Sequence, residues 1–261
     1  MRVIEWTNGL QGVTGAAWTG VQYVSTWRQG GASAAPWDSL NLGLHVGDEP
    51  AAVRENRDRV RAGLPAEPLW LEQVHGTTVW HADGAASQDR VVLDPGAAPC
   101  ADAAVTTSQG RPLAIMTADC LPVVLADEAG TVLGVAHAGW RGLAAGVLEN
   151  TLAAMRQQAP GASAWRAWIG PGIGFDAFEV GDEVRAVFVA ADAEAANCFA
   201  PSGRAGHWLA DLAGLAARRL AQAGVGLLES SGECTYRQAD RYFSYRRQAR
   251  TGRQATLAWL V

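Results

Sequence analysis

Residue types that metal ions and nucleophilic catalysis require stand at three places in the chain. His75 follows the run 71–74 and meets a glycine, Cys120 stands between two apolar runs, and His137 ends a third apolar run. All three are expected at strand ends, which mixed sheets commonly gather at one edge. Two imidazoles and one thiolate suit a catalytic zinc site, because such sites use three protein ligands and keep a fourth position open. Copper would accept the same donors.

Carboxylates near these residues extend the possible chemistry. Asp119 or Asp102 would orient an imidazole or act as a general base. The same side chains also fit a Cys–His nucleophile pair, with Cys120 attacking and His75 or His137 as its base. Sequence spacing does not separate a metal ligand from a nucleophile at Cys120. A cysteine in an apolar run is also often a small buried residue without chemistry.

Glycine-containing segments are candidates for ligand contact. Gly139 and Gly142 bracket Arg141 where a helix is expected to begin, and free N–H groups there favour an anion such as phosphate. Arg141 would add a forked contact, although a tight turn with a surface arginine fits equally well. The glycine-rich run 170–174 lacks the spacing of the dinucleotide fingerprint. His45, in another such segment, either lines a site or caps a turn.

Periodicity and turn signals predict strands and helices without the regular alternation of a doubly wound sheet. The predicted strands are 68–74, 113–117, 122–126, 131–137, 165–169 and 255–261. The strands 122–126 and 131–137 are expected to form a hairpin. The predicted helices run from a cap at Asp48 to a stop near Gly63, over 139–158 and over 208–223. We therefore expect an α+β fold, a single domain over residues 1–261 with mixed β-sheets flanked by helices.

Composition excludes several classes of protein. The chain has 261 residues, a formal charge of −5 and 49% hydrophobic residues, which excludes a disordered chain. Mild acidity argues against a nucleic-acid partner, and the six arginines between residues 237 and 253 are expected to be solvated or locally paired. No apolar leader or long apolar run is present, so we expect a cytoplasmic protein with no membrane contact. The four scattered cysteines form no CxxC motif and are expected to stay free.

Ordered motifs resemble one family over nearly the whole chain. The three that correspond to its core motifs are Glu72-Gln73-Val74-His75-Gly76, Thr117-Ala118-Asp119-Cys120-Leu121-Pro122-Val123 and His137-Ala138-Gly139-Trp140-Arg141-Gly142. Those that flank them are Ser39-Leu40-Asn41-Leu42-Gly43-Leu44-His45-Val46-Gly47-Asp48, Glu55-Asn56-Arg57, Ile169-Gly170-Pro171, Phe178-Glu179-Val180-Gly181, Phe243-Ser244-Tyr245-Arg246-Arg247 and Thr251-Gly252-Arg253. The chain is similar to the YfiH-like laccase-domain family, also called polyphenol oxidase or peptidoglycan editing factor.

The resemblance carries expectations about the fold and the chemistry. It implies mixed sheets flanked by helices, as in related cysteine hydrolases, and a zinc site at His75, Cys120 and His137. It implies phosphorolysis of adenosine, inosine and methylthioadenosine and deamination of adenosine, with Arg57 contacting the nucleoside or the phosphate. Two other activities are associated with the family: copper-dependent oxidation of phenols, and removal of mis-incorporated serine from peptidoglycan precursors by a cysteine-type amidase. Five histidines in the chain are too few for the usual multicopper set.

Overall fold

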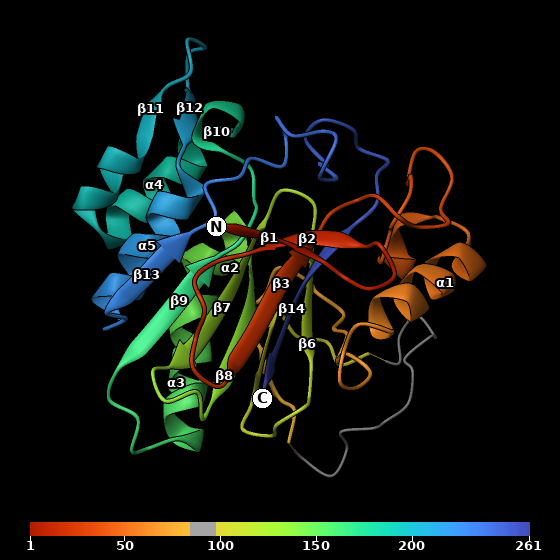
Figure 1. Ribbon diagram of the computed structural model, residues 1–261. Coiled ribbons are helices and arrows are strands. Elements are labelled where there is room, and N and C mark those ends of the chain that lie inside the picture. Colours follow the sequence, from red (N-terminus) through yellow and green to blue (C-terminus); the bar gives the residue numbers. More distant parts are fainter. Residues whose placement is uncertain (84–97) are drawn as a thin grey trace.

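Two β-sheets stacked face to face form the centre of this computed structural model, which describes residues 1–83 and 98–261 (Figure 1). The five-stranded sheet has the order β1 (Arg2–Glu5), β2 (Gln11–Thr14), β3 (Val21–Thr26), β14 (Gln254–Leu260) and β6 (Leu113–Thr117). The six-stranded sheet has the order β13 (Leu227–Ser230), β9 (Trp165–Ile169), β7 (Leu121–Asp127), β8 (Leu133–Ala138), β5 (Ala103–Thr106) and β4 (Val79–His81). A small third sheet has the order β10 (Glu179–Gly181), β12 (His207–Ala210) and β11 (Phe199–Pro201).

Helices cover the outer faces of the two large sheets. The α-helices are α1 (Pro50–Arg61), α2 (Trp140–Ala145), α3 (Val147–Gln158), α4 (Asp182–Ala191) and α5 (Leu212–Gln222), and the 3-10 turns are η1 (Leu44–Val46), η2 (Phe175–Ala177) and η3 (Ala193–Cys198). One core cluster joins the six-stranded sheet to α2–α5, a second lies between the sheets, and a third joins the five-stranded sheet to α1. The α+β fold of mixed sheets flanked by helices is confirmed. No helix in the described residues is long and apolar enough to cross a membrane.

Successive side chains of a central strand point to opposite faces of the sheet, so one strand contributes to two hydrophobic cores. In β7, Val123 and Leu125 face the helices, whereas Val124 and Ala126 face the other sheet. Both faces are buried, so the strand is a continuous apolar run. The predicted hairpin of β7 and β8 is confirmed, and Asp127 closes its turn by accepting hydrogen bonds from the segment that leads into β8.

Three predicted elements differ from the structure. The helix expected over 139–158 is two helices, because Gly146 adopts φ 100°, which ends α2 and begins α3. The helix expected over 208–223 begins only at Leu212, after Asp211 caps it, and the residues before it form β12. The expected strand 68–74 makes only isolated bridges. The strand β12 depends on pairing with β10 and β11, which are distant in sequence.

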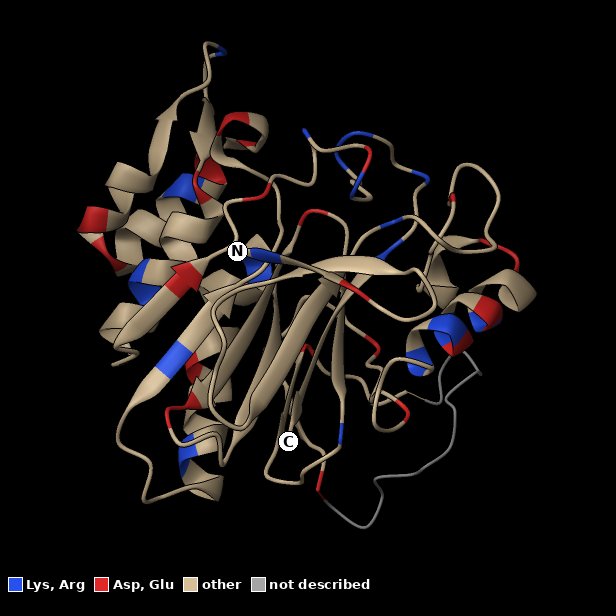
Figure 2. Cartoon of the chain, in the orientation of Figure 1, with Lys and Arg blue, Asp and Glu red and all other residues tan. Residues whose placement is uncertain are grey.

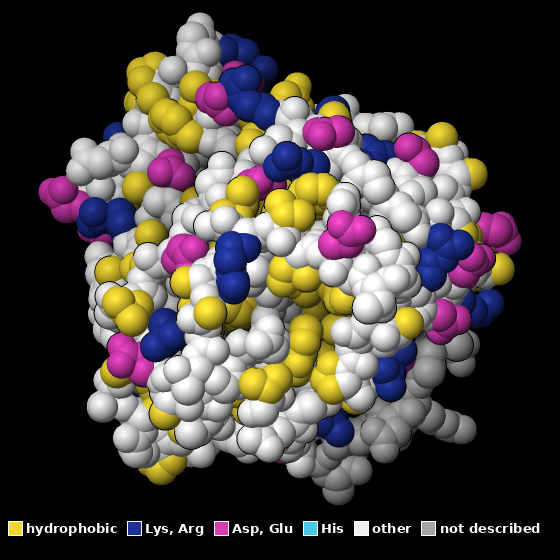
Figure 3. Space-filling view, viewed as in Figure 1, with side chains coloured by type: hydrophobic (Ala, Val, Ile, Leu, Met, Phe, Trp, Pro, Cys, Tyr) yellow, Lys and Arg dark blue, Asp and Glu magenta, His cyan; other side chains and the backbone are white. Residues whose placement is uncertain are grey.

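Charged side chains are distributed without a basic stripe on the face that Figure 3 shows, where acidic and basic groups lie among hydrophobic ones. The arginines of the C-terminal segment gather on loops above the sheets (Figure 2). Several of them are locally paired. Arg241 Nη1 lies 3.0 Å from Glu233 Oε1, and Arg247 donates hydrogen bonds to three backbone carbonyls. These loops bring the C-terminal segment beside the strand ends that carry the candidate site.

Candidate functional site

His75, Cys120 and His137 come together at one edge of the six-stranded sheet. One ligand atom from each lies within 4.8 Å of the other two, and Cys120 Sγ is 3.7 Å from His75 Nε2. The two imidazole rings meet edge-on with their centroids 4.7 Å apart. His137 is buried, Cys120 is partly buried and His75 is exposed, so the group opens to solvent on one side. It is the one cluster of three or more such donors in residues 1–83 and 98–261.

Strand register produces this convergence. Pro122 pairs with His137 across the β7–β8 ladder, so Cys120, which precedes β7, lies close to the end of β8. His75 comes from the segment before β4 and reaches the same edge through contacts with the residue that precedes β5, Asp102. Three segments far apart in sequence therefore supply one ligand each.

Asp102 is the buried carboxylate that orients two of the three ligands. Its Oδ1 accepts hydrogen bonds from His137 Nδ1 at 2.8 Å and from the His75 backbone N–H at 2.9 Å. Its Oδ2 accepts from the N–H groups of Val74 and Gly76, at 3.1 and 2.6 Å. Burial raises the pKa of Asp102, but these hydrogen bonds outweigh it and hold the pKa below its usual value. With Nδ1 committed, His137 keeps Nε2 for a metal or for Cys120.

Asp119 has a different position from the one its sequence neighbourhood suggested. Its carboxylate accepts hydrogen bonds from Thr235 Oγ1 and the backbone N–H of Arg246, both at 2.7 Å. Its carbonyl accepts from Ile173 N at 2.8 Å, so the residue ties two loops to the Cys120 turn. A catalytic role for Asp119 stays a prediction.

Left-handed backbone conformations occur on both ligand-bearing loops. His75 has φ 60° and Asp119 has φ 103°, and no other non-glycine residue in the described ranges has a positive φ. Such conformations cost of order 1–3 kcal/mol each and persist where surrounding contacts enforce them. Here the hydrogen bonds to the Asp102 and Asp119 carboxylates supply that enforcement.

Gly139 lies directly against the side chains of Cys120 and His75. A methyl group at this position would lie 2.8 Å from Cys120 Sγ and 2.8 Å from Cδ2 of His75. Gly142 is similarly tight, because a methyl group there would lie 2.9 Å from the carbonyl oxygen of Gly76. Gly139 is required because two ligand side chains pack against the start of α2, and Gly142 is required because the backbone of the His75 loop does so.

Electrostatics favour charge separation between Cys120 and His137. Burial raises the pKa of the Cys120 thiol, but the positive charge of His137 and hydrogen bonds from both imidazoles lower it to about 6. Burial lowers the pKa of His137, whereas the Cys120 thiolate and Asp102 raise it to about 9. In the metal-free chain the pair is therefore thiolate and imidazolium near neutral pH. Metal binding would release the imidazolium proton and use the thiolate as a ligand.

Zinc fits the donor set and its spacing. With typical Zn–N and Zn–S bonds, a tetrahedral site places nitrogen and sulfur ligands about 3.5 Å apart. The 3.7 Å between Cys120 Sγ and His75 Nε2 is close to that value. Three protein ligands with one exposed side leave room for a fourth ligand, as catalytic zinc sites do.

The predicted substrate-binding residues lie at different depths. Arg57 is buried on α1, where Nε donates to the Leu42 carbonyl at 3.0 Å and the guanidinium lies 4.1 Å above the Trp70 ring. His45 is exposed on η1. Arg141 is exposed on α2, with its guanidinium 4.5 Å from its neighbour's indole ring. Their roles stay predictions.

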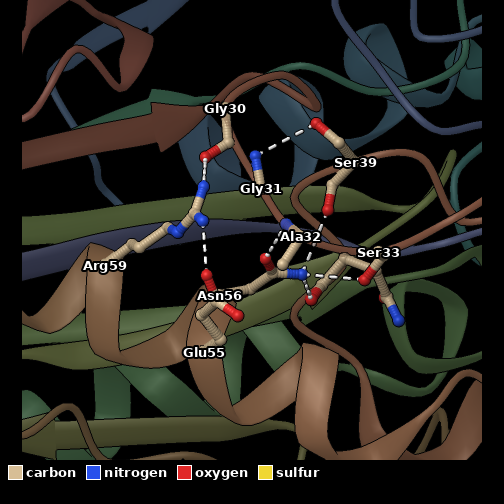
Figure 4. A network of polar contacts seen from close by, with 9 residues as sticks. Gly30, Gly31, Ala32, Ser33, Ser39, Glu55, Asn56 and Arg59 are labelled. Atoms are coloured by element: carbon tan, nitrogen blue, oxygen red, sulfur yellow. Dashed lines mark hydrogen bonds and ion pairs between the residues drawn. The ribbon is translucent and has the colours of Figure 1, made fainter.

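A buried amide network holds the segment that leads to His45. Asn56 is fully buried on α1; it donates to Ser33 Oγ and to the carbonyls of Ser39 and Asn41, and accepts from the Ala32 N–H (Figure 4). The sequence analysis placed this asparagine in a family motif and predicted no separate role for it. Buried polar groups of this kind are costly unless fully paired, so the network fixes one conformation of the segment.

Arg253 is a further residue near the site. The sequence analysis placed it in a basic run and in a family motif and predicted no role for it. Its backbone N–H donates to Asn41 Oδ1 at 2.9 Å, across 212 residues of sequence. Its side chain is partly buried and lies against Gly43. The motif Thr251-Gly252-Arg253 was the available signal, because a glycine beside an arginine permits close packing.

The chain is similar to known proteins over most of its length. The sequence profile of the family described as "Multi-copper polyphenol oxidoreductase laccase" matches residues 22–261. The chain belongs to this YfiH-like laccase-domain family. It is 49% identical over 235 residues to "Purine nucleoside phosphorylase PA4543" of Pseudomonas aeruginosa, covering 90% of this chain and 91% of the relative. It is 47% identical over 244 residues to "Purine nucleoside phosphorylase YfiH" of Escherichia coli K12, covering 93% and 95%.

Solved structures show the same fold. The crystal structure of Neisseria meningitidis protein NMB0706 matches with a TM-score of 0.85 and 44% sequence identity, covering 96% of this chain and 98% of that one. In the described residues, this family member has one group of three donors that could hold a metal ion, His75, Cys120 and His137.

Proposed function

We propose that the protein is a zinc-dependent purine nucleoside phosphorylase that acts on adenosine, inosine and methylthioadenosine and also deaminates adenosine. The observation that carries the proposal is the His75–Cys120–His137 group, open on one side, in a chain nearly half identical to proteins named purine nucleoside phosphorylase. Bound zinc would supply a Lewis acid at this position. The chain's own residues fix the ligands, through Asp102 and Gly139, and Arg253 lies close enough to Cys120 for their charges to interact.

Phosphorolysis sets demands that this chain can meet. A phosphate oxygen forms a bond to C1′ of the ribose, and the C1′–N9 bond breaks with its electron pair going to the purine. The proton of hydrogen phosphate ends on the purine, so the products are a free base and ribose 1-phosphate. The anion needs a positively charged partner and hydrogen-bond donors. Arg57 supplies a positive charge, and neutral His45 supplies a hydrogen-bonding group in the segment that Arg57 and Asn56 hold.

Metal reconstitution with product analysis tests the proposal. Chain freed of metal and reloaded with zinc or with copper is incubated with adenosine, with and without inorganic phosphate, and products are separated by chromatography. We expect adenine only with phosphate, inosine without it, and both only in the zinc-loaded protein. Cys120→Ala should lose the metal and both products. Zinc-loaded protein that forms neither product refutes the proposal, and rapid phenol oxidation by the copper form would favour the laccase activity.

A cysteine-type amidase is the second candidate, because one observation favours it. Cys120, His137 and Asp102 form a thiol–imidazole–carboxylate series, the arrangement that activates a nucleophile in cysteine hydrolases. This function predicts that metal-free protein releases serine mis-incorporated in a peptidoglycan precursor and forms a thioester on Cys120. Mass spectrometry of chelated protein with such a precursor decides: no adduct and no release excludes it.

A further inference from the structure

The position of Arg253 is fixed by strand pairing rather than by its own side chain. Gln254 pairs with Thr117 at the end of the β14–β6 ladder, so Arg253 lies beside the turn that carries Cys120. Its backbone also bonds the N-terminal segment, donating to Asn41 Oδ1 at 2.9 Å and accepting from the Leu42 N–H at 3.0 Å. The residue therefore joins two segments at the edge of the candidate metal site.

Gly43 allows the side chains of Arg253 and His45 to approach the same point. A methyl group on Gly43 would lie 2.9 Å from Cγ of Arg253 and 3.4 Å from Cε1 of His45. Arg253 Nη1 is held by the carbonyls of Thr251 and Gly252, at 3.2 and 3.0 Å. In the described part of the chain, its Nε and Nη2 make no hydrogen bond, so one edge of the guanidinium has donors available.

Charges of both signs act on this region. Burial lowers the pKa of Arg253, and the negative charges of Cys120 and Asp119 raise it without reversing the shift. Although His45 is exposed as a whole residue, desolvation of its ring lowers its pKa to about 4, and the charges of Arg253, Arg57 and His137 act in the same direction. His45 is therefore neutral at physiological pH and is able to donate or accept one hydrogen bond among cationic groups.

We propose that Arg253, together with His45, binds a phosphate group next to the His75–Cys120–His137 metal site. This inference rests on the proposed phosphorolysis for the identity of the anion as inorganic phosphate. The same chemistry would also suit a phosphate ester on the substrate. A guanidinium edge with two free donors matches phosphate oxygens, and a partly buried position strengthens charge-assisted hydrogen bonds.

Direct binding of inorganic phosphate to zinc-loaded protein, measured by calorimetry, tests the inference without depending on turnover. We expect Arg253→Gln to weaken phosphate binding at least tenfold, and Arg253→Lys to give an intermediate value because it restores the charge but not the fork. His45→Gln, an exposed substitution, should weaken binding about threefold. Zinc content and the KM for nucleoside should stay within about twofold. Arg250→Gln is the matched control, because Arg250 is exposed on the same segment with its guanidinium over Trp37.

The outcomes separate this inference from the proposed function. If the affinities for inorganic phosphate and for adenosine 5′-monophosphate both stay within twofold in Arg253→Gln, the inference is overturned. Loss of zinc together with phosphate also overturns it, because that result shows a merely structural role. Loss of phosphate binding in a protein that turns over no nucleoside supports the site and refutes the phosphorylase. If adenosine 5′-monophosphate, and not inorganic phosphate, loses affinity in Arg253→Gln, the site is supported for a phosphate ester. Wild-type phosphorolysis with an unchanged phosphate KM in Arg253→Gln supports the function and overturns the inference.

Discussion

Replacing Asp102 by asparagine removes the charge that holds two of the three ligands. The four hydrogen bonds reach its two oxygens in pairs: His137 Nδ1 and His75 N on Oδ1, and Val74 N and Gly76 N on Oδ2. An asparagine amide offers one oxygen, so in either orientation its NH₂ faces two donors. If the NH₂ faces His137, the imidazole must accept at Nδ1 and carry its proton on Nε2, where the metal would bind.

Two lost hydrogen bonds to a charged acceptor, at about 1.5 kcal/mol each, lower the free energy of unfolding by roughly 3 kcal/mol. A domain with ordinary stability remains folded after such a loss. Loss of a carboxylate that orients a metal-binding histidine weakens metal affinity by about 10- to 100-fold. We therefore expect Asp102→Asn to be folded, less stable and poor in zinc.

Asp127→Asn is the matched control. Asp127 is also buried, and it accepts hydrogen bonds from the Thr131 N–H and hydroxyl and from the Val132 N–H, at the hairpin turn on the other end of β7. Both variants are compared by urea unfolding and by zinc titration against a competing chelator. The control should lose stability and keep its zinc affinity. Equal stability losses, with zinc affinity of Asp102→Asn within twofold of the wild type, would show that Asp102 is only a structural carboxylate.

Three further predictions concern the surroundings of the site. Gly139→Ala should lower zinc affinity although all three ligands remain, because its methyl group would press on Cys120 Sγ. Zinc titration checks this. Gly161→Ala is the control, because Gly161 is exposed and a methyl group there would meet no atom within 4 Å. Because the folded pKa of His45 is about 4, below its unfolded value, the unfolded chain binds more protons between pH 6.5 and 4, and the free energy of unfolding should fall as the pH drops through that window. In His45→Gln, the free energy of unfolding measured with urea should change less steeply with pH. Asn56→Ala should cost about 3 kcal/mol in the same assay, because it leaves buried partners unpaired; a loss below about 1 kcal/mol would contradict the network in Figure 4.

The three donor residues of the site could be predicted from residue types, whereas its geometry could not. His75, Cys120 and His137 each stand beside a turn signal, which predicts strand ends. His137 lies at the end of β8 and Cys120 directly precedes β7, whereas the strand expected before His75 makes only isolated bridges. The four hydrogen bonds that Asp102 accepts, and the position of Arg253 beside the site, depend on contacts between segments far apart in sequence. An example is the hydrogen bond from Arg253 N–H to Asn41 Oδ1, across 212 residues. Propensity and periodicity carry no information about such pairs.

The fold was predictable to the same extent and for the same reason. The hairpin of β7 and β8 follows from a local turn whose side chain, Asp127, bonds its own turn. Gly146 lies in a sequence with unbroken helical spacing, yet it adopts a left-handed conformation and divides the helix, which the apolar periodicity does not indicate. Residues 207–210 form a strand because β10 and β11 pair with them on both sides.

Two aspartates explain how this family member holds a metal-ligand group on loops. His75 and Asp119 adopt left-handed backbone conformations, which unrestrained loops would leave. The Asp102 carboxylate fixes the first loop through three backbone N–H groups, and the Asp119 carboxylate fixes the second through Thr235 and Arg246. The ligand geometry therefore comes from hydrogen bonds to carboxylates that are not themselves ligands. A metal ion would therefore bind to a group that the fold has already assembled, because these hydrogen bonds offset the cost of the strained backbone at His75 and Asp119.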